Sequence, residues 1–385
     1  MSVLAAPAVA PAPMTARAPY APRATVVVLG RRIPAFQLFG ILGWISAIGL
    51  ACWLTGRQGW PLWVTGLLAA LSIVTFVVLV AAVKLLTGEE NIVYYHHEIA
   101  VAAISTLTLW LLGRPVLPYL DAVFMGLGLF LAWGRLGCFM VGCCHGRPCS
   151  WGVCYGPEHA RAGFSRHLVG VRLFPIQLVE ALIVAATVAA GAILIQRDVA
   201  PGTALAVYSI VYGLARFGLE LFRGDVARPY WRGASEAQWT SFVILAALLA
   251  LSGPGHVPGS GWLLAAVLAM AVVLAVGWAT DTPRRRQLRP RHVAEIARLL
   301  EATAGAADVH VGQTSLGLRI SGNTVRDGER TLDMFAFSEN DQSLDERTAR
   351  RLARVIARLR RAPTDGELTR GRPGVYHVVV APAGR

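Results

Sequence analysis

The chain has 385 residues, of which 55% are hydrophobic and only 15% are charged. This balance excludes an ordinary soluble globular protein, in which about a quarter of the residues are charged. The net charge of +13 comes almost wholly from arginine, which reflects either a compositional bias of the organism or contacts with anionic head groups. Because no basic stripe interleaved with aromatic residues is present, we expect membrane lipids and no nucleic acid as partners.

Residues 1–34 are rich in alanine and proline. Proline at this frequency blocks helices, and the segment has little apolar surface to bury. We therefore expect residues 1–34 to be disordered.

Eight apolar segments follow. A membrane-spanning helix needs about 20 residues, and lipid leaves the backbone few alternatives to a helix. The expected spans are Ala35–Leu54, Pro61–Leu86, Ile99–Leu112, Tyr119–Val141, Phe174–Ile195, Gly202–Phe222, Gln238–Leu251 and Gly261–Ala279. The predicted fold of residues 35–280 is an all-α polytopic membrane bundle with seven or eight transmembrane helices.

The composition changes abruptly at Thr282, where a basic run "TPRRRQLRPRH" begins. Beyond it, apolar residues at helical spacing predict two helices, near residues 291–305 and 343–361, and Ser343 with Glu346 three residues later forms a capping box for the second. The segments "DVHVGQTSLGLRIS", "TLDMFAFS" and "GVYHVVVAP" alternate as strands do. Residues 281–385 are therefore predicted to form a small soluble α+β domain.

Arginines are distributed unevenly among the predicted loops. The N-terminal segment, the loops after the fourth and sixth spans and the tail carry most of them, whereas the opposite loops hold only Arg57, Arg114 and Arg197. Counted this way, the positive-inside rule places both termini in the cytoplasm.

Three stretches combine membrane depth with charged or polar groups, and such groups are functional candidates because they are costly in lipid. The candidates are Arg135 at the end of the fourth span, Gln177 and Glu180 in "FPIQLVEAL", and Tyr212, Arg216, Glu220 and Arg223 in "VYGLARFGLELFRGD". Residues at these helical spacings share one face. The alternative is a purely structural ion pair between Arg216 and Glu220. However, Arg135 has no acid near it in sequence, and converging arginines suit a phosphate, which a guanidinium binds with two hydrogen bonds.

The motifs "GRLGCFMVG", "FPIQLVEAL" and "YGLARFGLELFR" occur in this order at these depths. In this respect residues 35–252 resemble the prolipoprotein diacylglyceryl transferase family. The resemblance implies a multi-pass protein of the bacterial cytoplasmic (inner) membrane that uses no cofactor. Its substrates would be phosphatidylglycerol and the lipobox cysteine of a prolipoprotein signal peptide. The diacylglyceryl group would move to the cysteine thiol, and glycerol 1-phosphate would be released.

The resemblance also implies roles for individual residues. Arg135 and Arg216 would stabilise the phosphate leaving group, with Tyr212 and Glu220 matching the tyrosine and glutamate of the sixth helix. Three further assignments complete the predicted site: Gly146 matches a glycine just after the signature loop, His97 is the expected base, and Gln177, Glu180 and Arg223 are expected to bind substrate.

The chain departs from the family pattern at four places. Cys138 and Cys143 replace a polar asparagine and an acid or glutamine, "HHEI" replaces a His-Gly-Gly turn, and Phe39-Gly40 replaces Tyr-Gly. The family also implies that the active site and the first residue face outside, opposite to the arginine count. Two other functions therefore stay open: a related transfer to another acceptor, and a non-catalytic lipid-binding scaffold.

Four of the six cysteines lie close together, with a histidine among them: Cys143, Cys144, His145, Cys149 and Cys154. The alternatives are a metal site, one or two disulfides if the loop faces an oxidising compartment, and free thiols that pack as small apolar residues. A thiol such as Cys143 acting as acceptor is a further hypothesis. Because the cluster contains no Cys-x-x-Cys pair, we expect no metal there.

Overall fold

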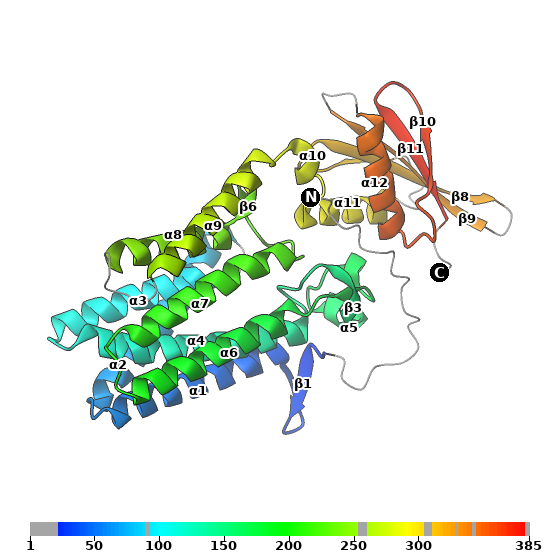
Figure 1. Cartoon of the computed structure of the whole chain (residues 1–385). Helices are drawn as coiled ribbons and strands as arrows, with labels where there is room; N and C mark the ends of the chain where they lie inside the picture. Colours follow the sequence, from blue (N-terminus) through cyan, green and yellow to red (C-terminus); the bar gives the residue numbers. More distant parts are fainter. Residues whose placement is uncertain are drawn as a thin grey trace.

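The computed structural model describes residues 22–88, 93–252, 260–303, 310–327, 330–340 and 344–381. Long helices form a bundle, and a smaller part made of strands and two helices is attached at one end (Figure 1). The bundle helices are α1 (Ala35–Arg57), α2 (Leu62–Thr87), α3 (Tyr94–Leu111), α4 (Val116–Val141), α6 (Ile176–Gln196), α7 (Thr203–Leu219), α8 (Glu236–Ser252) and α9 (Ser260–Ala279).

Six of these helices are long and apolar enough to cross a membrane: α1, α2, α4, α6, α7 with its short continuation to Phe222, and α9. The other two fall short for different reasons. Helix α3 begins with the polar run Tyr-Tyr-His-His-Glu, and α8 is a shorter apolar helix. The predicted membrane bundle is thus confirmed, but six helices of the described residues, and not seven or eight, have the length and apolar character of a span. Helices α3 and α8 pack between the longer helices.

Helix α4 lies at the centre of the bundle, and more than half of the residues in its most apolar stretch are buried. Small residues permit this close packing. A methyl group added at Gly126 would approach the Ala47 carbonyl oxygen of α1 to 3.1 Å, and one at Gly128 would meet Val188 of α6 and Tyr208 of α7 at 2.6 Å. Helices in lipid associate through such contacts, because apolar side chains gain little by leaving the hydrocarbon.

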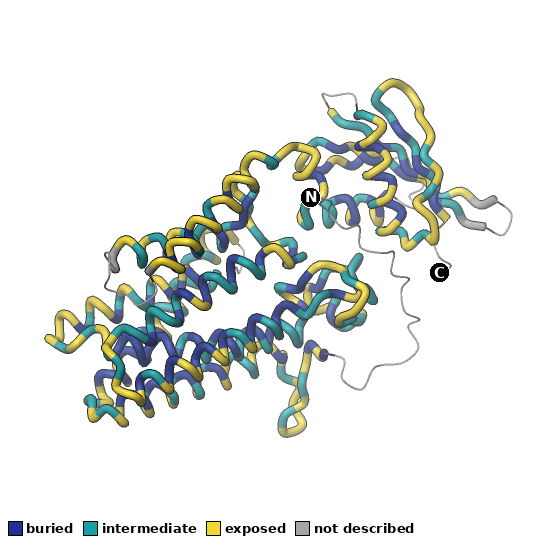
Figure 2. The backbone as a smooth tube through the Cα atoms, in the orientation of Figure 1, coloured by how far each residue is buried: buried dark blue, intermediate teal, exposed yellow. Residues whose placement is uncertain are grey.

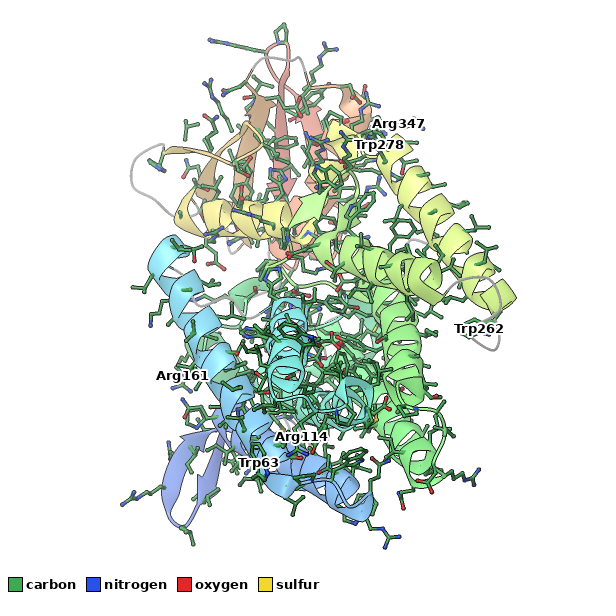
Figure 3. The ribbon with its side chains drawn as sticks, turned by 90° about the vertical axis from the view of Figure 1, so that its left-hand side faces the viewer. Trp63, Arg114, Arg161, Trp262, Trp278 and Arg347 are labelled. Carbon is green, nitrogen blue, oxygen red and sulfur yellow. The ribbon has the colours of Figure 1, made fainter. Side chains whose placement is uncertain are left out.

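The outer helices keep their apolar side chains exposed. In Figure 2, the yellow of exposed residues runs along α9. Only 11% of the residues in the most apolar stretch of α2 are buried. Trp63 and Trp278 lie near helix ends, where their amphipathic rings prefer the membrane interface. Figure 3 shows Trp63 beside Arg114 at the end far from the α+β part, and Trp278 close to that part.

The N-terminal segment contains a hairpin that the sequence analysis did not expect. Strands β1 (Thr25–Val28) and β2 (Arg31–Pro34) pair antiparallel. Leu29 and Gly30 both have positive φ angles, 49° and 77°, which is the backbone of a tight two-residue hairpin turn. The expectation of disorder is therefore wrong for residues 25–34, where a valine run meets a turn. Residues 1–21 lie outside the described residues.

The connections after α4 and α7 are structured. The long loop after α4 contains β3 (Pro148–Cys154), α5 (Pro157–Arg161), the 3₁₀ turn Arg166–Leu168 and β4 (Arg172–Leu173), around a small core of Tyr155, Phe164 and Leu173. After α7 come the 3₁₀ turn η2 (Glu220–Phe222), β5 (Tyr230–Trp231) and β6 (Ala234–Ser235). These connections form the wall of the site described below.

The C-terminal part is an antiparallel sheet with strand order β10-β11-β9-β8-β7. Its strands are β7 (Val311–Gln313), β8 (Leu318–Asp327), β9 (Arg330–Glu339), β10 (Glu367–Arg370) and β11 (Val375–Val380). After the short α10 (Pro283–Arg286), helices α11 (Pro290–Thr303) and α12 (Glu346–Leu359) share one hydrophobic core with the sheet. The predicted α+β architecture of the tail is confirmed.

The hairpin, the loop after α4 and the C-terminal part lie at the same end of the bundle (Figure 1). A hydrogen bond of 2.6 Å from Arg361 to the Val169 carbonyl oxygen joins the tail to that loop. Whichever way the bundle is oriented, these segments therefore face the same side of the membrane. The side itself stays a prediction.

Candidate functional site

The candidate site lies where α4, α6 and α7 approach the structured loops. Each helix contributes charged or polar side chains from its last or first turns on this side. Arg135 comes from α4, Glu180 from α6, and Tyr212 and Arg216 from α7, and all four are buried. Residues that are widely separated in sequence therefore meet at one end of the bundle.

Glu180 is the first of three carboxylates that hold the site together. Its carboxylate oxygens lie 3.0 Å from Nε of Arg135 and 3.9 Å from Nε of Arg216. The hydroxyl of Tyr212 donates to the same carboxylate at 3.3 Å. One acid of α6 thus orients side chains from both α4 and α7.

Glu220 is the second carboxylate and forms ion pairs with three arginines. The distances are 2.6 Å from Nη1 of Arg216, 3.2 Å from Nη1 of Arg223 and 3.0 Å from Nη1 of Arg228. The side chain of Glu220 is fully buried. A buried carboxylate with this many partners fixes the guanidinium groups in one geometry.

Asp225 is the third carboxylate and binds Arg223 with both oxygens, at 2.9 and 3.1 Å. Arg228 lies 3.5 Å from the same carboxylate. These two arginines belong to the loop after α7, so the ion-pair network continues from the membrane helices into the connection.

The network contains four guanidinium groups, of Arg135, Arg216, Arg223 and Arg228, and three carboxylates, of Glu180, Glu220 and Asp225. No side chain among the four arginines is more than 10% exposed. One positive charge therefore exceeds the acids at a buried position. Such an excess favours an anionic ligand, because unpaired buried charge is costly.

Gly146 and Gln177 lie at the loop side of the network. The Gly146 amide donates to the Phe174 carbonyl oxygen at 3.1 Å, and an added methyl group would approach that oxygen to 2.5 Å. Gln177 donates from Nε2 to the Cys143 carbonyl oxygen at 2.8 Å, and its Oε1 has no hydrogen-bond partner among the described residues. Gly146 thus permits close packing of the loop, and Gln177 leaves one acceptor available.

His97, the expected base, lies apart from this network. Its ring packs against Phe76 of α2 with a centroid distance of 4.6 Å, and its Nδ1 has no hydrogen-bond partner among the described residues. The neighbouring His96 pairs with Glu236 at 2.7 Å instead. The structure therefore brings together the predicted residues of α4, α6 and α7 but does not join His97 to them.

Tyrosines of α3 and α7 surround Tyr212 and were missed in the sequence analysis. The rings of Tyr94, Tyr95 and Tyr208 each lie 5.7 Å from that of Tyr212. Tyr94 and Tyr208 share a hydroxyl hydrogen bond of 2.9 Å, and Tyr95 bonds Ser241 at 2.7 Å. The paired tyrosines ahead of "HHEI" were the available signal. Phenol groups are therefore present at the site although Phe39 carries none.

Arg228 and Asp225 were also missed, because they follow the last apolar residue of their span. The alternation of charges in "RGDVAR" was the signal for them. A separate cavity of about 690 Å³ lies at the junction with the tail and is lined by Tyr230, Arg232, Trp278 and Arg289 among others. It does not include the residues of the ion-pair network, so we place the site at the network.

Comparison with known proteins identifies the family to which the chain belongs. The family model for prolipoprotein diacylglyceryl transferase matches residues 25–252, more than half of the chain. The chain belongs to the prolipoprotein diacylglyceryl transferase family. The match runs from the N-terminal hairpin to the end of α8 and contains every residue of the network.

Two curated relatives are similar over a shorter segment. A phosphatidylglycerol–prolipoprotein diacylglyceryl transferase 2 of Clostridium perfringens is 30% identical over 115 residues, and one from Clostridium tetani is 28% identical over 110 residues. These segments cover 29% of this chain and 41% and 43% of the relatives. The matching segments thus span less than half the length of the two curated relatives.

Proposed function

We propose that this protein transfers the diacylglyceryl group of phosphatidylglycerol to the lipobox cysteine thiol of a prolipoprotein in the cytoplasmic membrane. The observation that carries the proposal is the buried excess of guanidinium groups at the membrane end of the structured loops. Phosphatidylglycerol supplies a single phosphate charge on a diester, which matches this excess.

In the proposed reaction, Arg135 and Arg216 hold the phosphate. The thiolate of the acceptor attacks the glyceryl carbon, and the bond from that carbon to the phosphate oxygen breaks. The phosphate then leaves with a second negative charge. Guanidinium groups that are already oriented stabilise this developing charge without reorganisation. Glu180 and Glu220 position the two arginines, and Tyr212 fixes Glu180.

Complementation tests the proposal. A bacterial host is depleted of its own transferase and expresses this chain, and lipidation of a reporter lipoprotein is followed by gel shift. We expect rescue by the wild-type chain and none by Arg135→Ala or Arg216→Ala. Arg197→Ala is the matched control, because Arg197 is an exposed arginine after α6 at the opposite end of the bundle. It should rescue fully.

The alternatives give different results. A well-expressed, inserted wild-type chain that does not rescue would contradict transfer to the lipobox cysteine. Release of glycerol phosphate from phosphatidylglycerol by that same chain would then indicate another acceptor, for which the replacement of the family phenol by Phe39 is the motivating observation. Binding of the lipid without turnover would indicate a scaffold.

A further inference from the structure

Three cysteines converge beside the ion-pair network. Cys138 lies in the last turn of α4, and Cys143 and Cys144 follow in the turn that leaves this helix. Their sulfur atoms all lie within 4.8 Å of one another, and none is in a disulfide. Cys149 and Cys154, which the sequence analysis placed in the same cluster, do not belong to this group.

The backbone of this turn is unusual. Gly142 closes α4 with a φ of 84°, and Cys144 also has a positive φ, 54°. A residue with a side chain rarely adopts this left-handed conformation, and where it does the strain often marks a functional site. The two reversals bring the adjacent side chains of Cys143 and Cys144 back over the helix end, toward Cys138.

Positive charge surrounds the sulfur atoms. The guanidinium groups of Arg223 and Arg135 lie close enough to the Cys144 sulfur to interact with it electrostatically. Arg135 precedes Cys138 by one turn of α4, so the same helix carries a phosphate-binding candidate and a sulfur ligand. Thiolate is the form of cysteine that binds metals.

The group offers three ligands and no fourth. Among the described residues, no histidine or carboxylate completes it within the same distance. The adjacent His145 bonds the Gly146 carbonyl oxygen at 2.9 Å through Nδ1, and its ring packs on Phe164. Structural zinc sites have four protein ligands, whereas catalytic sites have three and keep one position open.

We propose that Cys138, Cys143 and Cys144 bind one zinc ion whose open fourth position takes the acceptor thiol. Zinc–sulfur bonds of about 2.3 Å in a tetrahedron place sulfur atoms about 3.8 Å apart, which the three thiols reach with small movements. The inference rests on the proposed function for its catalytic part. It replaces the expectation that the site holds no metal.

The zinc-bound acceptor thiol is the nucleophile of the proposed transfer step. The acceptor thiol loses its proton to water when it binds zinc, because a coordinated thiol is deprotonated. The bound sulfur attacks the glyceryl carbon with its electron pair, and a carbon–sulfur bond forms while the carbon–oxygen bond to phosphate breaks. The oxygen keeps that electron pair and leaves as glycerol phosphate against the arginines. No oxidant or reductant is required, and no separate base such as His97 is needed.

Metal analysis of the purified full-length chain tests the site without any activity. The chain is extracted in detergent under reducing, anaerobic conditions, stripped with a chelator and titrated with zinc or with cobalt(II). We expect about one zinc per chain and a thiolate-to-cobalt charge-transfer band at the same stoichiometry. Cys144→Ser should lose both signals. The matched control, Cys149→Ser combined with Cys154→Ser, should keep both, since it removes two thiols of the same loop.

Two results would overturn the metal site: a folded, reduced wild-type chain that binds no zinc and gives no cobalt band, or a native disulfide between any two of the three cysteines by mass spectrometry. Titration of the wild-type chain keeps the test valid if the serine variant does not fold. Activity then separates the two proposals. Lipidation by a metal-free chain would overturn the zinc step and leave the transferase proposal standing. Stoichiometric zinc without lipidation would support the site and contradict the transferase proposal.

Discussion

Arginines occupy opposite environments in the bundle and on the outer helices of the tail. Those of the network are almost fully buried on carboxylates, as with Arg223, whose side chain is 5% exposed. Those of α10 and α12 extend into solvent, as with Arg284 at 57% and Arg350 at 69% exposure. A bias toward arginine explains the second group without any function, but not the first, because burying a guanidinium is costly unless it is paired. Where an arginine is buried is thus more informative than how many there are.

The largest expected effect is on Glu220, which compensates three arginines. Glu220→Gln leaves these guanidinium groups with one negative charge fewer, and we expect a loss of about 3–5 kcal/mol in unfolding free energy, as for other broken buried pairs. Thermal unfolding of the chain in detergent measures it. Glu346→Gln is the matched control on α12, where the carboxylate pairs with exposed Arg350. Equal losses of unfolding free energy in both variants would show that buried and exposed ion pairs contribute alike in this protein.

The packing of the loop against the network gives the next effect. Gly146→Ala places a methyl group 2.5 Å from the Phe174 carbonyl oxygen, and we expect a cost of about 1–3 kcal/mol from overpacking. Gly134→Ala on α4 has open space around the new methyl group and should not destabilise the chain. Unfolding midpoints of both variants make the comparison. An unchanged unfolding midpoint in Gly146→Ala would show that the loop can move away from the added methyl group at little cost.

The loop beside the network should also respond to pH through His167. Burial, with a further contribution from the charge of His145, lowers its pKa to about 4. An unfolded histidine has a pKa of about 6.5, so the unfolded chain binds a proton that the folded chain does not as the pH falls from there to about 4. Stability should therefore decline over this window. Hydrogen exchange of residues 142–175 at several pH values measures the decline, and His167→Gln should flatten it.

The smallest effect is expected on the tail surface. Arg350→Ala removes an exposed pair with Glu346 at i, i+4, and such pairs contribute about 0.5 kcal/mol or less. A shift of the unfolding midpoint beyond that size, or a loss of reporter lipidation, would mean that the outer face of α12 contacts something more than solvent.

Much of the bundle and the centre of the ion-pair network could be predicted from the sequence. Apolar runs located the spans, and charges within them identified Arg135, Glu180 and Arg216, because ionisable groups in lipid need partners. Asp225 and Arg228 were missed since they follow the end of the helix, where Asp225 pairs with Arg223 and Arg228 reaches Glu220. The grouping of Cys138 with Cys144 depends on a backbone conformation that no spacing rule predicts.

Helix and hairpin ends were predicted less well than the helices themselves. Ser343 was expected to cap α12, but it lies outside the described residues. The helix begins with Asp345 instead, whose carboxylate accepts the Thr348 amide at 2.9 Å. The N-terminal hairpin was hidden by the proline-rich residues before it. In both cases the sequence allowed more than one start for the element. The hydrogen bonds in the structure show which start is used.

Helix α9 begins just after the end of the family match, and it returns the chain to the end where the network lies (Figure 1). Without this one helix, the chain leaving α8 would deliver the tail to the far side of the bilayer. The placement of the α+β part beside the site therefore depends on whether the number of membrane passes is even or odd. An even number of passes decides which compartment the tail shares with the arginines, and a single added or deleted helix would separate them without altering a residue of either.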